Sequence, residues 1–444
     1  MSYNQDTIAA IATPNGRGGI GVIRVSGPDS VRIGLGLTNK VLEPRVATFS
    51  KFFGEADQAI DEGLLIYFRK PHSFTGEDII ELQGHGGRVV MEMLLKRVIQ
   101  LGARQANPGE FSQRAFLNDK IDLTQAEAIA DLIDSASQEA ALASVRSLQG
   151  EFSQKINSLL DKLIRLRVLI EADLDFPEDD IEVSNNTQFQ HLAKEILRDL
   201  DNILGGVREG VALSEGVALV LTGKPNAGKS SLMNALCKSD TSIVTDIPGT
   251  TTDVVKENAV IAGVPFRIMD TAGMRMAANE IEAEGLKRAS AEIDRSDIIL
   301  RLVDVSQMEP PYEVSPELRA EDPREMIVCN KIDLVKDLEI PEDYLTISAK
   351  TGEGLDELKQ KLSEKAGISS ASALTFTARS RHIEAIEETR LHMLKASELI
   401  EAPSSPDLVA EELRLSQKTL SRVTGAFSSD DLLGEIFQNF CIGK

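Results

Sequence analysis

The sequence contains no tryptophan, only four tyrosines and only three cysteines among its 444 residues. The cysteines, Cys237, Cys329 and Cys441, are scattered and odd in number, which excludes a disulfide framework and a cysteine-rich zinc site. No apolar run approaches the roughly 18 residues that a membrane-spanning helix needs. The first residues carry neither a basic segment nor a long apolar segment, so we expect no export signal, no membrane partner and a cytoplasmic location.

Basic charge is also scarce, because 48 Lys and Arg face 70 Asp and Glu, for a formal net charge of −22. The imbalance is uneven. Residues 1–118 carry 13 basic and 12 acidic side chains, so residues 119–444 carry a net charge of −23. Such an acidic chain repels polyanions at long range. If RNA is a substrate, we expect a basic partner subunit to hold much of it.

The pattern of apolar residues predicts a multidomain α/β protein with three parts. In residues 1–118, β-branched runs bounded by Gly, Pro and Asp predict an α+β domain of about five strands and two short helices. Residues 119–213 and 377–444 show helical periodicity and predict one discontinuous helical bundle. Strands alternate with helices over residues 214–376, which predicts a parallel α/β domain inserted into the bundle.

Individual helix ends are also predicted. Thr124 and Glu127 have the spacing of a capping box. A helix through Ile156 is expected to stop near Phe176-Pro177, and the next helix is expected to stop at Gly205-Gly206 because paired glycines disfavour helix. After residue 376 the apolar period predicts three helices, over His382–Leu399, Leu408–Leu420 and Leu432–Phe440.

Residues 223–230, GKPNAGKS, match the pattern G-x-x-x-x-G-K-S between a buried strand run and a helical segment. In this pattern, glycines allow backbone N–H groups to surround phosphate oxygens. Lys229 supplies a positive charge to the β and γ phosphates, and the Ser230 hydroxyl is available to Mg²⁺. The sequence therefore predicts a nucleotide triphosphate site.

Three further segments each follow a predicted strand: Asp270–Gly273 (DTAG), Asn330–Asp333 (NKID) and Ser348–Lys350 (SAK). Their order resembles that of the Ras-like GTPases, in which N-K-x-D and S-A-K read guanine. A carboxylate such as Asp333 accepts from both guanine N1–H and the N2 amino group, and adenine offers neither donor there. We therefore predict that GTP is the nucleotide. The predicted GTP-binding residues are Asn226, Ala227, Gly228, Lys229, Ser230, Ser231, Thr245, Asp246, Ile247, Pro248, Gly249, Thr250, Thr251, Asp270, Thr271, Ala272, Gly273, Asn330, Lys331, Asp333, Ser348, Ala349 and Lys350.

The residues that would catalyse hydrolysis differ from those of many Ras-like GTPases. Many Ras-like proteins carry a water-orienting glutamine after D-x-x-G, but this chain has Met274, which cannot orient water by hydrogen bonding. Arg275 could act as an arginine finger, although a flexible surface arginine is the simpler interpretation. The alternative is a monovalent cation held by Asn226 and by the oxygens of residues 245–252. The residues alone do not decide between an arginine finger and a bound monovalent cation.

Five segments outside the four nucleotide motifs are long and specific: ATPNGRGGIGVIRVSGP (12–28), SFTGEDIIELQGHGG (73–87), PGEFSQRAFLNDKIDLTQAEAIADLI (108–133), TDIPGTTTD (245–253) and the terminal FCIGK (440–444). With these segments, essentially all 444 residues resemble the bacterial MnmE (TrmE) family of tRNA-uridine-modifying GTPases.

The resemblance implies a homodimer formed through the N-terminal domain and G domains that meet in the GTP state under K⁺ activation. By matching position, Ser230 and Thr251 would hold Mg²⁺, with Asp270 acting through water. Glu282 would orient the attacking water, and Lys229 would act in catalysis. The residues that would hold K⁺ are Asn226, Thr245, Ile247 and Thr250.

The resemblance also implies that the N-terminal domain binds 5,10-methylene- or 5-formyl-tetrahydrofolate. The matching positions are Arg24, Glu81, Lys120 and Lys444. Arg and Lys suit the folate carboxylates, and Glu suits the donors of the pterin edge. Cys441 is either a reactive thiol in that pocket or a small apolar anchor of the tail.

The implied function is GTP hydrolysis coupled to installing an aminomethyl-type (carboxymethylaminomethyl) group on C5 of the wobble uridine, U34, of certain tRNAs. The implied partners are tRNA and the FAD protein MnmG (GidA), in a heterotetramer or larger complex. One alternative is a regulatory or ribosome-assembly GTPase without a folate site. Another is a scaffold whose GTPase is vestigial, which the intact set of Lys229, Ser230, Asp270 and Asp333 disfavours.

Overall fold

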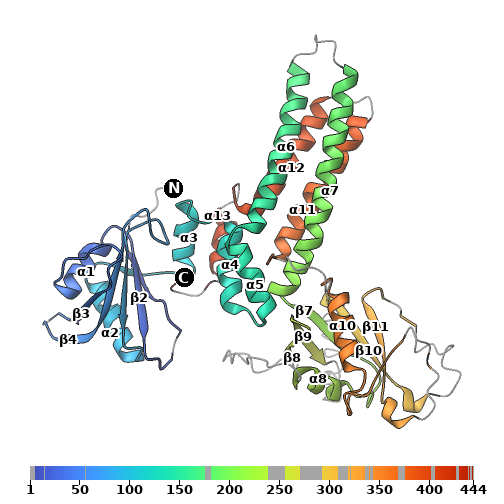
Figure 1. Ribbon diagram of the computed structural model, residues 1–444, viewed down its shortest axis with the longest axis horizontal. Helices are drawn as coiled ribbons and strands as arrows, with labels where there is room; N and C mark the ends of the chain where they lie inside the picture. The colour runs from blue at the N-terminus through green and yellow to red at the C-terminus, as the bar shows by residue number, and fades with distance from the viewer. Residues whose placement is uncertain are drawn as a thin grey trace, which may run out of the picture. The chain divides into compact units, whose positions relative to one another are not determined.

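The computed structural model divides the chain into two compact units. Unit 1 comprises residues 1–130 and 421–444, and unit 2 comprises residues 131–420. The residues that the structure describes are 6–14, 16–55, 57–175, 182–238, 256–270, 293–308, 319–320, 322–335, 340, 344–368, 376–401, 406–426, 430–438, 440 and 443. Each unit contains helices and a sheet (Figure 1), and the chain as a whole has the multidomain α/β character that the sequence predicted.

Unit 1 is built on a six-stranded sheet with the strand order β3-β4-β5-β2-β1-β6. Neighbouring strands are antiparallel except for β1 and β6, which pair in parallel. In this register Arg24 of β2 lies directly opposite Glu81 of β5. The strand bounds are β1 Ile8–Ile11, β2 Gly21–Ser26, β3 Thr48–Phe53, β4 Ala59–Phe68, β5 Ile79–Gly84 and β6 Arg104–Gln105.

Two helices of unit 1, α1 (Ser30–Thr38) and α2 (Arg88–Gln100), pack against this sheet. Their apolar residues form one core with alternate residues of the strands, including Ile23, Leu82 and Leu94, all fully buried. The alternation of strand side chains therefore leaves Arg24 and Glu81 on the opposite face of the sheet from this core.

The other helices in unit 1 are α3 (Glu110–Leu117), the first part of α4 (Leu123–Asp134), which ends in unit 2, and α13 (Asp430–Gln438). An apolar cluster that includes Phe116, Leu123 and Phe437 joins them, so the end of the chain packs with its first 130 residues. The predicted capping box of Thr124 and Glu127 was wrong by two residues. Asp122 caps α4, because its Oδ1 accepts from Gln125 N at 2.9 Å while its own N donates to Gln125 Oε1 at 3.0 Å.

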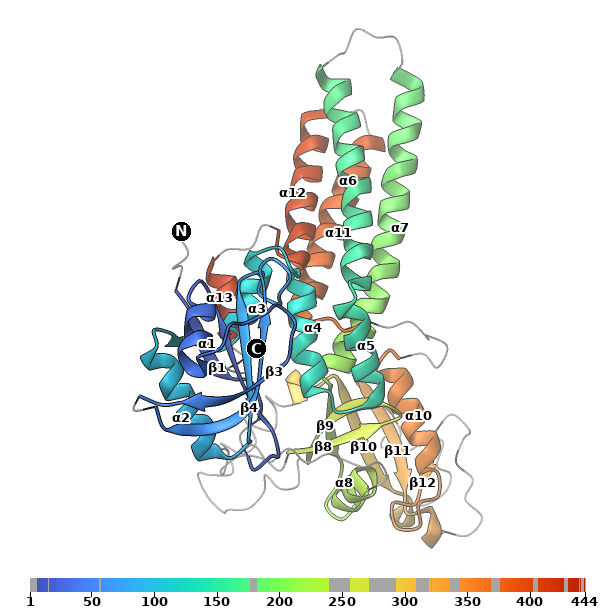
Figure 2. The ribbon, with the colours of Figure 1, turned by 60° about the vertical axis from the view of Figure 1, so that its left-hand side comes forward.

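Unit 2 contains the helical bundle. Figures 1 and 2 show α6, α7, α11 and α12 running alongside one another, and α5 leads into α6. The three helices predicted after residue 376 are confirmed, within a few residues, as α11, α12 and α13. The bounds in the bundle are α5 Gln138–Leu148, α6 Glu151–Asp175, α7 Glu182–Ser214, α11 Ser380–Glu401 and α12 Pro406–Thr424.

The prediction that a helix ends at Gly205-Gly206 was wrong, because α7 continues through both glycines to Ser214. The reason is a tertiary contact. A Cβ on Gly206 would lie 3.4 Å from the Phe376 ring, and a Cβ on Gly210 would lie 2.3 Å from the Phe376 carbonyl oxygen. The small residues therefore let the returning chain at Phe376 pack closely on α7.

The sheet of unit 2 has six strands in the order β12-β11-β10-β7-β9-β8, parallel except for the β8–β9 hairpin. This is the parallel α/β arrangement that the alternation of strands and helices predicted. The bounds are β7 Val217–Thr222, α8 Lys229–Lys238, β8 Lys256–Ile261, β9 Val264–Asp270, β10 Ile298–Asp304, η2 Val305–Gln307, β11 Glu325–Asn330, η5 Ile332–Leu334, β12 Leu345–Ile347 and α10 Leu355–Lys365.

The chain enters and leaves this sheet at one place. Glu215, just after α7, accepts from Ser380 N at 2.8 Å and from Ser380 Oγ at 2.6 Å. Ser147 of α5 accepts from Thr377 N at 2.9 Å. Among the helices that the structure describes, none combines the length and apolar character needed to cross a membrane.

Candidate functional site

The phosphate-binding loop lies between β7 and α8, at the carboxyl end of the parallel sheet. Gly228 has φ +98°, and a Cβ there would lie 2.3 Å from Asn330 Nδ2, so the tight turn requires glycine at this position. Lys229, only 6% exposed, donates from Nζ to the carbonyl oxygens of Gly223 at 2.9 Å and Lys224 at 3.0 Å. The loop thus holds its cation at its centre, where a phosphate would sit.

A hydroxyl and a carboxylate meet beside this loop. Ser230, at the start of α8, donates from Oγ to Asp270 Oδ2 at 3.0 Å. Asp270 ends β9 and is 5% exposed, so its carboxylate is held at the sheet edge. Oxygen donors of these two types are those that Mg²⁺ prefers, and the pair therefore fits the metal that the sequence predicted.

The two predicted guanine-reading loops also meet the phosphate loop. Asn330, at the end of β11, donates from Nδ2 to Ala227 O at 2.7 Å and accepts from Ala349 N at 3.0 Å. Ser348, after β12, donates from Oγ to Asp333 Oδ1 at 2.7 Å. Three segments separated in sequence by about 100 and 20 residues are thus joined by side-chain hydrogen bonds into one site.

Several predicted site residues lie outside the described residues. They are Thr245, Asp246, Ile247, Pro248, Gly249, Thr250, Thr251, Thr271, Ala272, Gly273, Glu282, Cys441 and Lys444. Met274 and Arg275 lie outside them as well. Asn226 is described, and its φ of +64° places it in the left-handed region within the phosphate loop.

In unit 1 the structure pairs two of the predicted folate residues. Arg24 Nε donates to Glu81 Oε1 at 2.9 Å across the β2–β5 ladder, and both side chains are mostly buried. The Arg24 guanidinium also lies over two rings, 5.4 Å from the centroid of Phe74 and 5.8 Å from that of Phe111. The sequence analysis did not single out these two phenylalanines, which hold the guanidinium plane in place.

The other two predicted folate positions, Lys120 and Lys444, lie outside the strands of the sheet in the sequence. Lys120, after α3, donates from Nζ to Pro71 O at 2.8 Å. Lys444 lies outside the described residues, but its neighbour Gly443 is buried. A Cβ on Gly443 would come within 2.5 Å of Ile11 O, so Gly443 itself lies directly against the end of β1.

A buried charge network, which the sequence analysis missed, supports this region. Arg114 of α3 donates to Asp6 Oδ1 at 2.7 Å, to Glu110 Oε1 at 3.0 Å and to Glu77 at 3.2 Å. Arg104 binds Glu110 with both terminal nitrogens. Burial by itself raises the pKa of Glu110, but hydrogen bonds from Arg104, Asn107 N–H and Arg114 outweigh burial and lower that pKa.

The two described cysteines are not reactive centres. Cys329 is fully buried in β11, and burial raises the pKa of its thiol to about 11. Burial and the charge of Glu257 raise the pKa of the Cys237 thiol as well. Both thiols therefore stay protonated near neutral pH, as structural cysteines do.

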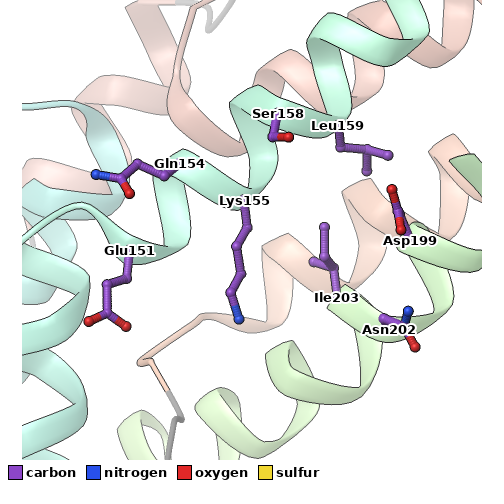
Figure 3. Close-up of a pocket in the computed structure, with 8 residues that line it drawn as sticks. All are labelled: Glu151, Gln154, Lys155, Ser158, Leu159, Asp199, Asn202 and Ile203. Atoms are coloured by element: carbon purple, nitrogen blue, oxygen red, sulfur yellow. The ribbon is translucent and has the colours of Figure 1, made fainter.

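A separate open groove of about 490 Å³ lies between α6 and α7. Figure 3 shows Lys155 reaching from α6 beside Ile203 and Asn202 of α7. The Lys155 ammonium lies 5.0 Å from the Phe376 ring centroid, and Asp199 is paired with Lys162 at 2.7 Å. The charges of Lys155 and Asp199 are thus engaged within the bundle, and none of the predicted site residues lines the groove.

Known proteins match this sequence along nearly its whole length. A family model described as the GTP-binding protein TrmE N-terminus matches residues 7–120, and one described as the MnmE helical domain matches residues 123–441. The chain is 47% identical over 444 residues to the tRNA modification GTPase MnmE of Legionella pneumophila, covering 99% of each. It is 47% identical over 450 residues to that of Vibrio parahaemolyticus, again covering 99% of each, and 45% identical over 456 residues to that of Photobacterium profundum, covering 100% of each. The chain therefore belongs to the MnmE family of tRNA modification GTPases.

Proposed function

We propose that this chain is a cytoplasmic GTPase that takes part in modifying C5 of the wobble uridine, U34, of certain tRNAs. The observation that carries the proposal is the junction of the phosphate loop with Asn330, Ser348 and Asp333 in a chain of this family. Asp333 has one carboxylate oxygen on Ser348, which fixes its orientation. A fixed carboxylate at that position discriminates guanine from adenine.

The phosphate end of the site supplies charge and metal ligands. Lys229 would exchange its carbonyl partners for the β and γ phosphate oxygens of GTP. Ser230 and Thr251 would hold Mg²⁺ directly, with Asp270 acting through water. The bound metal would neutralise charge that develops on the phosphates during hydrolysis.

The chain has Met274 where a water-orienting glutamine is common, so another group must complete the catalytic site. We propose that K⁺ does so, held by Asn226, Thr245, Ile247 and Thr250 when two G domains meet in a homodimer. The left-handed backbone of Asn226 is compatible with turning its amide oxygen toward the phosphates. Glu282 would orient the attacking water.

We further propose that unit 1 binds a tetrahydrofolate that supplies the one-carbon unit. Glu81 suits the amino-pyrimidine edge of the pterin, and Arg24, Lys120 and Lys444 suit carboxylates. The close approach of Gly443 to Ile11 supports a tail that helps enclose the ligand. The FAD protein MnmG would complete the reaction on tRNA, and the three-part division at residues 118, 213 and 376 would separate the folate, helical and GTPase parts.

The deciding experiment is mass analysis of tRNA nucleosides from a strain that lacks this chain, complemented with plasmid copies. The native copy should restore the modified wobble uridine, and a Lys229→Ala copy should not. If tRNA from the deletion strain still carries the modified wobble uridine at its normal level, the proposal would be overturned. The rival, a regulatory GTPase without a folate site, predicts in addition that the full-length chain shows no heat of folate binding by calorimetry.

Cys441→Ser separates the two interpretations of that residue. If the thiol reacts, tRNA modification should fail in the Cys441→Ser strain while the purified variant still binds folate and dimerises. If Cys441 only anchors the tail, the variant should still modify tRNA, and a reactive role would be abandoned.

A further inference from the structure

A buried carboxylate stands behind the guanine-reading loop. Asp304 is the last residue of β10, and its partner in the β10–β11 register is Asn330. Its Oδ2 lies 2.5 Å from the Nζ of Lys331, the second residue of the N-K-x-D segment. The Asp304 side chain is 7% exposed, whereas that of Lys331 is 26% exposed, so the ion pair is anchored at its carboxylate end.

The carboxylate has a second tie that fixes its position. Asp304 Oδ1 accepts from Ser306 N at 3.1 Å and from Ser306 Oγ at 2.6 Å in the short helix η2. Burial raises the pKa of Asp304, but the hydrogen bonds from Lys331 and Ser306 outweigh it and lower that pKa, so the group is ionised at neutral pH. Asp304 therefore presents a fixed negative charge to one side chain of the loop.

The backbone at Lys331 has a conformation that non-glycine residues adopt infrequently. Lys331 has φ +70°, in the left-handed region, between the end of β11 and the start of η5. A lysine side chain that is free to rotate loses conformational entropy about several bonds when it packs against a ligand. Because the Asp304 carboxylate already holds its ammonium, much of that freedom is lost before any nucleotide arrives.

We infer that Asp304 is a positioning residue of the guanine site, which clamps Lys331 so that its alkyl chain forms a fixed wall beside the bound base. The inference rests on the proposed GTPase function and deepens it, because it adds a residue outside the four loop motifs. Lysine stems cover apolar surface while the charged end finds a polar partner, and here that partner is built into β10. Asp304 acts through Lys331 and does not itself reach the nucleotide.

The test is a double-mutant cycle on the dissociation rate of fluorescent GDP from the full-length protein. Asp304→Ala should speed dissociation about tenfold, since a charged hydrogen bond that orders the lysine is lost. Lys331→Ala should speed dissociation at least as much. In the Lys331→Ala background, Asp304→Ala should add less than about twofold, because its only route to the nucleotide is gone.

Two variants separate this role from a merely structural one. Asp304→Asn keeps an acceptor for Ser306 but loses the charge that holds Lys331, so it should behave like Asp304→Ala. Asp322→Ala breaks an ion pair with Arg324 before β11, at the opposite end of that strand, and should leave dissociation unchanged. Thermal unfolding of each variant checks that the fold is retained.

The outcomes are distinct. Equal effects of Asp304→Ala in the native and Lys331→Ala backgrounds, or native behaviour of Asp304→Asn, would overturn the clamp while leaving guanine-nucleotide binding intact. A native protein that binds no fluorescent GDP would overturn the proposed function together with the clamp.

Discussion

The nucleotide site of unit 2 and the Arg24–Glu81 site of unit 1 are assembled in different ways. In unit 2, the loops that follow the parallel strands β7, β11 and β12 meet at one edge of the sheet, where Asn330 bonds to both of the other loops. In unit 1, the paired residues stand in mid-strand on one face of an antiparallel sheet, and the tail approaches from the far end of the chain. A parallel sheet gathers sites at its carboxyl edge, whereas an antiparallel sheet offers a face.

The largest difference between the two sites is expected at the phosphate end of the nucleotide site, in the rate of GTP hydrolysis. If K⁺ completes the GTPase site, replacing K⁺ by Na⁺ at equal ionic strength should slow hydrolysis by roughly 10³-fold or more, the range of an arginine finger. Phosphate release measured in matched KCl and NaCl buffers checks this. Folate binding to unit 1, measured in the same two buffers, serves as the control and should not change. Equal hydrolysis rates in both salts would remove K⁺ from the mechanism.

At the guanine end of the site, nucleotide preference should depend on the carboxylate of Asp333 alone. Asp333→Asn replaces an acceptor by a donor, so GTP binding should weaken by at least about 2 kcal/mol. Xanthosine triphosphate should bind relatively better, because its 2-oxo group accepts where guanine donates. Competition between the two nucleotides measures the switch, and an unchanged preference would refute the role of Asp333.

The unit 1 site should respond less strongly and independently of the first. Lys120→Ala should weaken folate binding by about tenfold in calorimetry, since one charged hydrogen bond to a carboxylate is worth about 1.5–3 kcal/mol and solvent reduces it. GTP hydrolysis should stay near the native rate because Lys120 lies outside unit 2. A matched change, Lys96→Ala on α2, should leave both activities unaltered. Loss of hydrolysis in Lys120→Ala would show that the two units are not independent.

The smallest effect concerns acid stability of unit 1. Because Glu110 and Asp6 have lowered pKa values in the folded state, the network contributes its full stability above the ordinary pKa values of 4.5 and 3.8. That contribution is lost as pH falls through the lower folded pKa values. The urea midpoint of the native protein should therefore fall from pH 5.5 to pH 3.5 more steeply than that of Glu110→Gln. Parallel pH profiles would exclude Glu110 as a source of this dependence.

The different construction of the two sites explains why the sequence predicted the nucleotide site more completely than the Arg24–Glu81 site. The short motifs at the ends of strands, and their order along the chain, predicted one nucleotide site through their resemblance to the Ras-like GTPases. These motifs contain Lys229, Asp270, Asn330 and Asp333. The pairing of Arg24 with Glu81 depends on strand register, which no local pattern encodes. The resemblance gave both residues as folate-binding positions but did not predict that they contact each other.

Errors in the predicted helices have the same origin. Gly205-Gly206 disfavours helix locally, but packing of Phe376 on α7 overrides that preference. The cap at Asp122 was missed because Thr124 and Glu127 offered a competing match to the same spacing rule. The buried network of Arg104 and Arg114 with three carboxylates joins residues about 100 positions apart, beyond the reach of any window along the chain.

The joining of Glu215 to Ser380 has a consequence for how the chain folds during synthesis. Helix α7 packs extensively along α11, yet about 165 residues separate the end of one from the start of the other. At about 5–20 residues per second, a ribosome needs roughly 10–30 seconds to make that stretch. The intervening sheet can fold within this delay and bring its two ends together. It then closes a long loop in advance, so that α11 meets α7 at a small entropic cost.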